Sequence, residues 1–306
     1  MKFSVLIPAY KKQYLQECIE SVLSQSFNDY EIVIVDDCSP EDIKSVVHLF
    51  NDSRISYYRN VKNFGAVDVV SNWNQCLAYA TGDYVICMGD DDKLLPNCLE
   101  EYARLIAKYP GLGVYHGWTE IIDEHSLFKD ITASRIEYES VYSLIWNRWN
   151  GRIQQFIGDF AFDRKKLIDK GGFYKQPLAW ASDDITSVIM AEEKGIANTS
   201  SIVFQYRVSP STISSKSGYK TKIDAIRDEK KWFQAFLKKE TSEEINKKYK
   251  KSIENCFENH FNKKYVIYIT RDIKKNRIRF FYWLWYSKAY NLSYSYILYS
   301  LIMSYK

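Results

Sequence analysis

The sequence predicts an α/β protein with a mixed, mainly parallel sheet flanked by helices, followed by a helical appendage. Across roughly the first 110 residues, short apolar runs alternate with segments whose apolar residues recur at helical spacing. This alternation is typical of parallel strands that are buried on both faces and connected by helices. Residues 216–306 instead indicate helices with Lys/Glu faces and an aromatic tail. We therefore expect a domain over 1–215 and a basic, aromatic-rich helical region over 216–306.

Composition allows a sizeable core, because 46% of the 306 residues are hydrophobic. The charge is uneven: residues 1–215 carry 21 Lys/Arg and 29 Asp/Glu, a balance of −8, whereas residues 216–306 carry 21 and 9, a balance of +12. The six cysteines show no metal-ligand spacing, so we expect reduced thiols in a cytosolic protein. The apolar run before Pro8 indicates a strand rather than a signal peptide. The sequence has no run of about 18 apolar residues, so we expect no membrane-spanning helix.

The elements of the first half follow from these runs in chain order. Strands are predicted at 3–7, 31–35, 55–58 and 83–88. Helices are predicted between and after them at 14–26, 43–50, 69–80 and 99–109. Ser39 is expected to cap the helix at 43–50, with Pro40 in its first turn and Asp42 completing a capping box.

Beyond residue 110 the pattern is mixed. Short strands are predicted at 113–117 and 202–206, and a helix at 185–193 ends at Gly195. Ligands of parallel sheets bind beyond the carboxyl ends of the strands. Pro8–Tyr10, Asp36–Asp37 and Gly89–Asp92 are all at such ends, so we expect them to face one cleft.

Asp90, Asp91 and Asp92 repel one another if nothing else is bound. A divalent cation such as Mg²⁺ or Mn²⁺ prefers hard oxygen ligands, and its charge would offset the repulsion between the carboxylates. Phosphate oxygens would then fill the coordination positions that the carboxylates leave open. A solvated acidic turn is the alternative for an isolated triplet. A second acidic pair after a neighbouring strand, and a third at Asp183–Asp184 before a helix, favour the cation.

Several motifs in the same order resemble the family 2 glycosyltransferases of the GT-A fold. They are VLIPAY, IVIVDDCSPED, NWNQCLAYATGDYVICMGDDDKLLP, GGF, and two adjacent aspartates followed, after ten intervening residues, by a glycine. The resemblance covers roughly residues 3–215, with a nucleotide-sugar-binding half at 1–110 and an acceptor-binding half at 111–215. Two departures stand out: Gly89 replaces the first Asp of the usual Leu-Asp-x-Asp-Asp, and Asn72-Trp73-Asn74 replaces Ala-Arg-Asn.

The resemblance implies roles on the donor side. Pro8, Ala9 and Tyr10 would line the nucleotide base, Asp37 would accept hydrogen bonds from uracil or ribose, and Asn63 would approach base or ribose. Asp90 would contact the ribose. Asp91, helped by Asp90 or Asp92, would bind the cation that bridges the diphosphate.

The resemblance also implies roles near the acceptor. Asp183–Asp184 occupies the Glu-Asp position, so Asp184 would be the catalytic base and Asp183 its support, although two acids can also complement a helix dipole. Arg207, before a flexible segment that includes Ser211, would clamp the diphosphate. Trp180 could stack on an acceptor sugar or pack in the protein.

These parts predict a metal-assisted single displacement with inversion. The expected donor is a UDP-sugar, and the expected acceptor is a hydroxyl of a glycan or polyprenyl-linked glycan in surface polysaccharide biosynthesis. The alternatives are a sugar-nucleotide nucleotidyltransferase, disfavoured because no Gly-rich loop follows the first strand, and a non-catalytic sugar-binding domain.

The segment 274–303 combines cationic and aromatic residues, as interfacial helices do. It predicts peripheral attachment of a cytoplasmic protein to the inner face of the membrane. The alternative is an appendage that packs on the catalytic domain or on a second subunit, so a homodimer is compatible with the sequence. Nothing else supports binding of nucleic acid.

Overall fold

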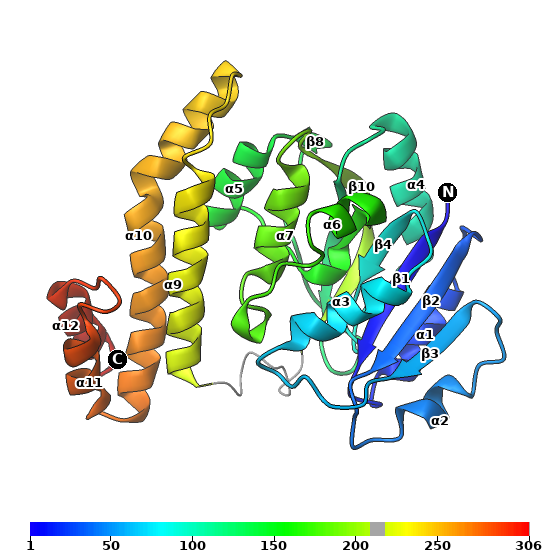
Figure 1. Ribbon diagram of the computed structural model, residues 1–306, viewed down its shortest axis with the longest axis horizontal. Coiled ribbons are helices and arrows are strands. Elements are labelled where there is room, and N and C mark those ends of the chain that lie inside the picture. The colour runs from blue at the N-terminus through cyan, green and yellow to red at the C-terminus, as the bar shows by residue number, and fades with distance from the viewer. Residues whose placement is uncertain (209–217, 306) are drawn as a thin grey trace. The chain divides into compact units, whose positions relative to one another are not determined.

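The computed structural model describes residues 1–208 and 218–305 (Figure 1). These residues form two compact units. The first contains residues 1–175 and 181–208, and the second contains 176–180 and 218–305. The second unit thus includes a short segment, 176–180, that the sequence did not distinguish from its neighbours.

The first unit is organised around one sheet. Within residues 1–208 the strands follow the order β3-β2-β1-β4-β9-β6-β10-β5, with β7 paired to β6 and β8 paired to β10. Their bounds are β1 Phe3–Ala9, β2 Tyr30–Asp36, β3 Ile55–Arg59, β4 Tyr84–Cys87, β5 Lys93–Leu94, β6 Val114–Ile122, β7 Phe128–Ile131, β8 Tyr138–Glu139, β9 Phe160–Asp163 and β10 Ile196–Arg207.

The half formed by β3, β2, β1 and β4 is parallel throughout. It contains the four apolar runs predicted as strands, and β1 lies between β2 and β4 with Ile7 opposite Ile34 and Leu6 opposite Cys87. Strand β9 then pairs antiparallel with both β4 and β6, so the sheet is mixed. The carboxyl ends of β1, β2, β3 and β4 consequently lie along one edge.

Helices cover both faces of this sheet (Figure 1). Helices α1 (Leu15–Leu23), α2 (Ile43–Val47) and α4 (Cys98–Lys108) contribute apolar side chains to the core on one face. Helix α3 (Val69–Tyr79) packs on β1 and β2, α6 (Arg164–Asp169) packs on β9, and α7 (Ser182–Ala191) packs on β6 and on α5 (Val141–Trp149).

The predicted cap of α2 was wrong. Asp42 is the N-cap, and its carboxylate accepts from the N–H of Ser45. Ser39 instead donates its hydroxyl to the carbonyl of Tyr10 at 2.6 Å and accepts from the N–H of Glu41. It therefore joins the loops after β1 and β2 rather than starting the helix.

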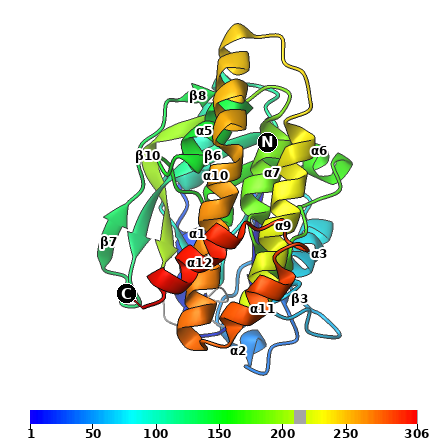
Figure 2. The same cartoon turned by 90° about the vertical axis from the view of Figure 1, so that its left-hand side faces the viewer.

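The second unit consists of η2 (Pro177–Ala179), α9 (Tyr219–Phe236), α10 (Glu244–Lys275), α11 (Arg279–Tyr286) and α12 (Tyr294–Met303). Helices α9 and α10 run side by side in opposite directions in Figures 1 and 2. Phe233 of α9 and Phe261 of α10 are buried between them, and α11 and α12 pack against α10. In the part of the chain that the structure describes, no helix has both the length and the apolar character needed to span a bilayer.

Candidate active site

The loops after the parallel strands are joined to one another by hydrogen bonds. The N–H of Asp37, after β2, donates to the carbonyl of Ala9 at the end of β1 at 2.9 Å. The buried carboxylate of Asp37 accepts from Asn60 Nδ2 at 2.9 Å and from the N–H of Phe64 at 3.0 Å, both after β3. The exposed Asn63 belongs to the same loop. The predicted base- and ribose-binding residues are thus brought together.

In the segment Asn72-Trp73-Asn74, which stands where the family pattern has Ala-Arg-Asn, both asparagines hold neighbouring segments. Asn72 Oδ1 accepts from Asn60 Nδ2, the same amide that reaches Asp37, and Asn72 Nδ2 donates to the carbonyl of Val35. Asn74 accepts from the N–H of Phe173 at 2.8 Å and donates to its carbonyl at 3.0 Å. Both side chains therefore bind the backbone of neighbouring segments, while the buried Trp73 stands at the position of the family's Arg and packs on Phe173.

Two of the three adjacent acids after β4 are held by backbone N–H groups. Asp90 Oδ2 accepts from the N–H groups of Tyr10 and Lys11, each at 2.7 Å. Asp92 Oδ1 accepts from the N–H of Arg207 at 2.9 Å, and its Oδ2 accepts from the N–H of Gly89 at 3.3 Å. These acids connect the end of β4 to the end of β1 and to β10.

Asp91 is different, because its carboxylate accepts no hydrogen bond from another residue within 1–208 or 218–305. It lies beside Gly89, where an added Cβ would be 2.8 Å from Asp91 Oδ1 and 2.9 Å from Asp92 Oδ2. The glycine at this position therefore leaves room for the two carboxylates, which explains the departure from the family pattern in steric terms.

Electrostatics follow from this crowding. Burial, and then the charge of Asp91, raises the pKa of Asp90 to about 6. Burial also raises the pKa of Asp91 and of Asp92, and the Lys11 ammonium partly offsets the rise at Asp91. Among the described residues no three His, Cys, Asp or Glu side chains are grouped so as to hold a metal ion alone. The site fits a cation that takes one carboxylate ligand and completes its shell with phosphate and water.

The second acidic group lies at the start of α7. Asp184 Oδ1 accepts from Arg148 Nε and from Gln155 Nε2, each at 2.7 Å. Asp183 Oδ1 accepts from the N–H of Asp184 at 2.9 Å. Burial, and then the charge of Asp184, raises the pKa of Asp183 to about 7. Within this pair Asp183 thus has a pKa near neutrality, while the side chain of Asp184 is fixed by a cation and an amide.

Tyr206 links the two acidic groups. After burial, the negative charges of Asp92, Asp91 and Asp183 all raise the pKa of its phenol. Its ring stacks on Phe156, with ring centroids 3.8 Å apart. Asp91 and Asp92 after β4 and Asp183 of α7 therefore all lie close enough to Tyr206 for their charges to act on its phenol.

Comparison with known proteins agrees with this geometry. The family model described as "Glycosyl transferase family 2" matches residues 4–172. The chain belongs to glycosyl transferase family 2. The match covers β1 to β4 and the aspartates after β4 and ends before α7, so the family predicted from the sequence is confirmed.

Individual relatives of this family 2 chain include two named glucosyltransferases. The GalNAc(5)-diNAcBac-PP-undecaprenol β-1,3-glucosyltransferase of Campylobacter jejuni is 30% identical over 179 residues, 57% of this chain and 55% of that protein. The UDP-Glc:α-D-GlcNAc-diphosphoundecaprenol β-1,3-glucosyltransferase WfgD of Escherichia coli is 26% identical over 219 residues, 69% and 79% respectively. The chain thus spans about half the length of the Campylobacter protein.

A solved structure confirms the predicted fold class. The crystal structure of S. aureus TarS 1-349 in complex with UDP-GlcNAc has a TM-score of 0.62 and 17% identity, covering 92% of this chain and 75% of that one. At this identity the likeness concerns the fold, a GT-A-type α/β sheet accompanied by C-terminal helices.

Arg207, predicted as a phosphate clamp, contacts several groups of the protein in this structure. Its buried guanidinium donates to the carbonyl of Asp91 at 2.7 Å, to Ser126 Oγ at 2.9 Å and to Glu17 Oε2 at 3.1 Å. It also lies over the ring of Tyr14, 4.1 Å from the centroid. These contacts support the acidic turn, and the role of Arg207 as a phosphate clamp stays a prediction. Ser211 lies outside the described residues.

Trp180 belongs to the helical unit. Its indole N–H donates to Glu229 Oε2 at 2.9 Å, and its ring meets Tyr268 edge to face. This is the packing alternative of the sequence analysis. An acceptor role would need the part of the ring that these contacts leave accessible.

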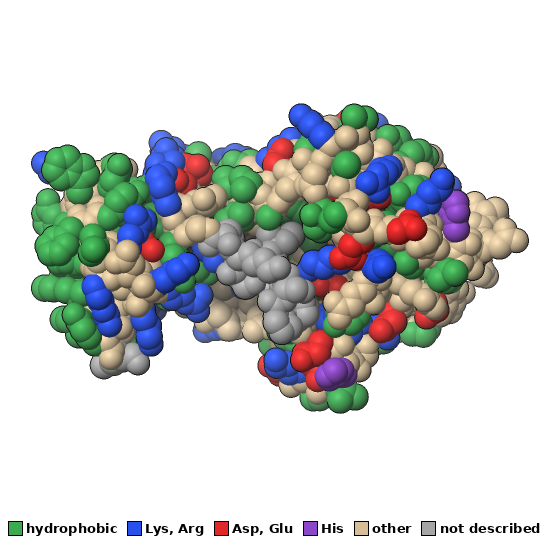
Figure 3. Space-filling view, turned by 90° about the horizontal axis from the view of Figure 1, so that it is seen from below, with side chains coloured by type: hydrophobic (Ala, Val, Ile, Leu, Met, Phe, Trp, Pro, Cys, Tyr) green, Lys and Arg blue, Asp and Glu red, His purple; other side chains and the backbone are tan. Residues whose placement is uncertain are grey.

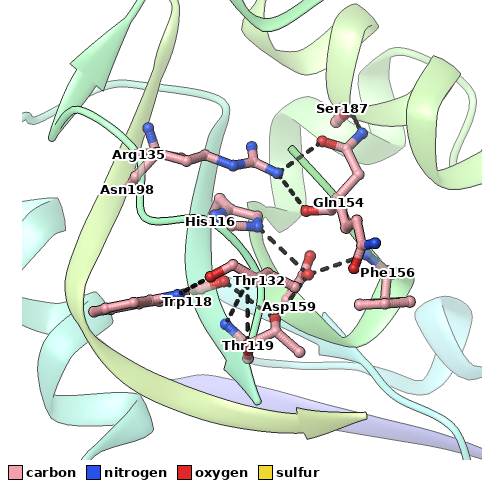
Figure 4. A network of polar contacts seen from close by, with 12 residues as sticks. His116, Trp118, Thr119, Thr132, Arg135, Gln154, Phe156, Asp159, Ser187 and Asn198 are labelled. Carbon is pink, nitrogen blue, oxygen red and sulfur yellow. Dashed lines mark hydrogen bonds and ion pairs between the residues drawn. The ribbon is translucent and has the colours of Figure 1, made fainter. Parts of the chain in front are cut away.

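A buried polar network holds the segment that carries Gln155 and Phe156 (Figure 4). Asp159 Oδ2 accepts from Thr119 Oγ1 and from the N–H of Phe156, each at 3.0 Å, and lies 3.4 Å from His116 Nε2. Burial raises the pKa of Asp159 to about 8, and burial and the charge of Arg135 lower the pKa of His116, so the imidazole is neutral. The network fixes the backbone that aims Gln155 at the acid pair.

Sequence reasoning missed Arg148, Gln155 and Lys11. Arg148 and Gln155 are 36 and 29 residues from Asp184 in the chain, and no local pattern connects them to it. Lys11 follows the predicted base-binding residues directly, so its position next to Tyr10 was the available signal.

Proposed function

We propose that this protein transfers a sugar from a nucleotide-diphosphate donor, UDP-linked, to a hydroxyl of a glycan or polyprenyl-linked glycan. The observation that carries the proposal is the carboxylate of Asp91, which accepts no hydrogen bond from another described residue and which lies, like Asp183 of α7, close enough to Tyr206 for its charge to act on that phenol. Family membership supports the reaction class. The names of the relatives and the ligand of TarS support the donor and the acceptor, because they include UDP-Glc, UDP-GlcNAc and undecaprenol-linked diphosphates.

Asp37 and Asn63 are proposed to bind the uridine, with the backbone of Pro8, Ala9 and Tyr10 along the base. Asp37 is pre-ordered for this role because Asn60 and the N–H of Phe64 fix its carboxylate. Asp90 is fixed as well, since Oδ2 binds two N–H groups, which leaves its second oxygen for the ribose.

Mn²⁺ or Mg²⁺ would be held mainly by Asp91, with Asp90 beside it. Such an ion would stabilise the charge that develops on the departing diphosphate. Both oxygens of Asp92 already accept backbone hydrogen bonds, so its proposed role is to fix the turn. Lys11 lies close enough to Asp90 and Asp91 to affect their pKa values, and it would add positive charge near a bound diphosphate.

Asp184 is proposed as the general base for the acceptor hydroxyl, supported by Asp183. Arg148 and Gln155 orient its carboxylate, and a pKa near 7 at Asp183 provides a neighbouring site for the proton. If Asp184 takes the proton of the acceptor hydroxyl, that hydroxyl can displace the diphosphate from the sugar directly, and no second protein nucleophile is needed. The predicted outcome is a single displacement with inversion, so that an α-linked donor gives a β-glycoside.

A donor screen by UDP release tests the proposal. Wild type, Asp184→Asn and the exposed control Asp169→Asn would be assayed with glycan and polyprenyl-diphosphate-linked acceptors. We expect acceptor-dependent UDP release that falls about 10²–10⁴-fold in Asp184→Asn and is unchanged in the control. Metal-dependent UDP binding without turnover on any acceptor would favour the non-catalytic alternative, and full activity of Asp184→Asn would refute the base assignment.

A further inference from the structure

Helices α11 and α12 expose stripes of large apolar side chains. On α11 and the residue before it, Ile278, Phe281 and Trp285 recur at i, i+3 and i+7, and Phe281 and Trp285 are 68% and 85% exposed. On α12, Tyr294, Leu298 and Ile302 recur at i, i+4 and i+8 and are also exposed. Such spacing places each set on one side of its helix. Figure 3 shows hydrophobic side chains gathered over this end of the helical unit, with Lys and Arg side chains nearby.

Phe281 and Trp285 are exposed because the opposite side of α11 packs against the rest of the second unit. Trp283 is fully buried and donates its indole N–H to Asp272 Oδ2 at 2.8 Å. Arg279 also binds Asp272 at 2.8 Å. Tyr290, just after the helix, donates to Asp224 Oδ1 at 2.7 Å. With its inner face bound in this way, α11 must present Phe281 and Trp285 outward.

The charge around these stripes has one sign. Residues 273–306 contain six Lys/Arg and no Asp or Glu. Arg277 and Arg279 are engaged by Ser304 and Asp272. Lys274, Lys275 and Lys288 are exposed and form no ion pair with any described residue. Exposed cations therefore adjoin the exposed aromatic side chains.

We infer that the α11–α12 surface binds the face of an anionic lipid bilayer. Tryptophan and tyrosine favour the headgroup level, and unpaired lysines are attracted to anionic headgroups. A second copy of the chain is a poorer occupant, because residues 273–306 carry Lys and Arg but no Asp or Glu, so a two-fold interface would bring like charges together. The inference depends on neither the donor nor the metal, so it can fail while the proposed function stands.

Vesicle flotation of the 306-residue chain tests the inference. The probes are vesicles of phosphatidylcholine alone and of phosphatidylcholine mixed with phosphatidylglycerol. We expect flotation with the mixed vesicles that weakens in high salt. The variant Phe281→Ser/Trp285→Ser should lose at least about a hundredfold in partitioning, because two side chains no longer enter the interface. The matched control Leu127→Ser/Phe128→Ser, at positions 62% and 66% exposed in the first unit, should bind as wild type.

Lysine variants test the electrostatic part. Replacing Lys274, Lys275 and Lys288 by Gln should lower partitioning on the order of a hundredfold, whereas replacing the exposed Lys44, Lys129 and Lys194 should change it little. All substituted positions are exposed, so unchanged melting curves are expected and would exclude unfolding as the cause. Equal binding by wild type and the aromatic variant, or no binding to anionic vesicles, would overturn the inference. So would a concentration-dependent dimer that the aromatic variant abolishes without vesicle binding.

Discussion

Replacing Asp91 by Asn should have two effects of opposite sign. The substitution keeps the shape of the side chain and removes one negative charge. Because the carboxylate of Asp91 accepts no hydrogen bond from another described residue, no donor loses its partner. In the absence of metal the change relieves repulsion, and in its presence it removes the principal ligand.

The size of the first effect follows from the neighbours. The charge of Asp91 contributes to the raised pKa of both Asp90 and Asp92. Two unit charges about 4–8 Å apart at an effective dielectric constant of about 20 repel by roughly 2–4 kcal/mol, and partial protonation and screening reduce this. We expect the metal-free variant to be about 1 kcal/mol more stable than wild type, a rise of a few degrees in Tm.

The second effect is larger. We expect loss of this carboxylate ligand to weaken binding by about 10²–10³ in Kd, which corresponds to about 3–4 kcal/mol. Titration calorimetry with UDP and Mn²⁺ would measure it, with chelator as the metal-free reference and Asp130→Asn, on the exposed strand β7, as the control. Metal-dependent UDP binding retained within a factor of three, or a less stable metal-free protein, would refute the assignment of Asp91.

Three further outcomes are expected. Gly89→Ala should weaken metal-dependent UDP binding about tenfold, because its Cβ would displace the adjacent carboxylates, whereas Gly218→Ala has no neighbour within 4 Å and should be neutral. Arg148→Met should lower kcat by about ten- to a hundredfold with little change in donor KM, since a charge-assisted bond to Asp184 is lost, and Arg148→Lys should restore part of it. The folded-state pKa values of Asp90 and Asp183 are raised to about 6 and about 7, so the native protein binds more protons than the unfolded chain between about pH 4 and 7. These two acids should therefore reduce the stability of the metal-free protein as the pH rises through that window, and denaturant titrations of the matching Asn variants should show a flatter profile.

The parallel half of the sheet could be predicted because its signals are local. FSVLI and EIVIV are each apolar at four of five positions, a pattern typical of strands buried on both faces, and these segments became β1 and β2. The acidic turns were also local signals, placed by the strand ends that precede them. The position of each acidic turn directly after an apolar run was sufficient to locate the strand and the turn.

Side-chain roles required the tertiary structure. The role of Arg207 as a phosphate ligand was implied by the resemblance to the family, and only the tertiary structure shows that Ser126 and Glu17, from distant parts of the chain, bind its guanidinium. The antiparallel insertion of β9 between β4 and β6 had no local signal either, since FAFD is too short to distinguish a strand from a turn. Ser39 and Asp42 both suit an N-cap, and the demand of the Tyr10 carbonyl for a donor explains why Asp42 is used.

The arrangement of the acids suggests how a run of like charges can serve both fold and function. Asp90 and Asp92 are held by four backbone N–H groups from three segments, so they fix the end of β4 relative to β1 and β10. Burial and the repulsion between neighbouring carboxylates raise the pKa values of Asp90 and Asp92, and their backbone hydrogen bonds keep both side chains in place. Only Asp91 is left without a donor among the described residues, and a cation with its diphosphate would satisfy it. Three adjacent aspartates are therefore one proposed ligand and two supports, and substituting each in turn should separate ligand binding from stability.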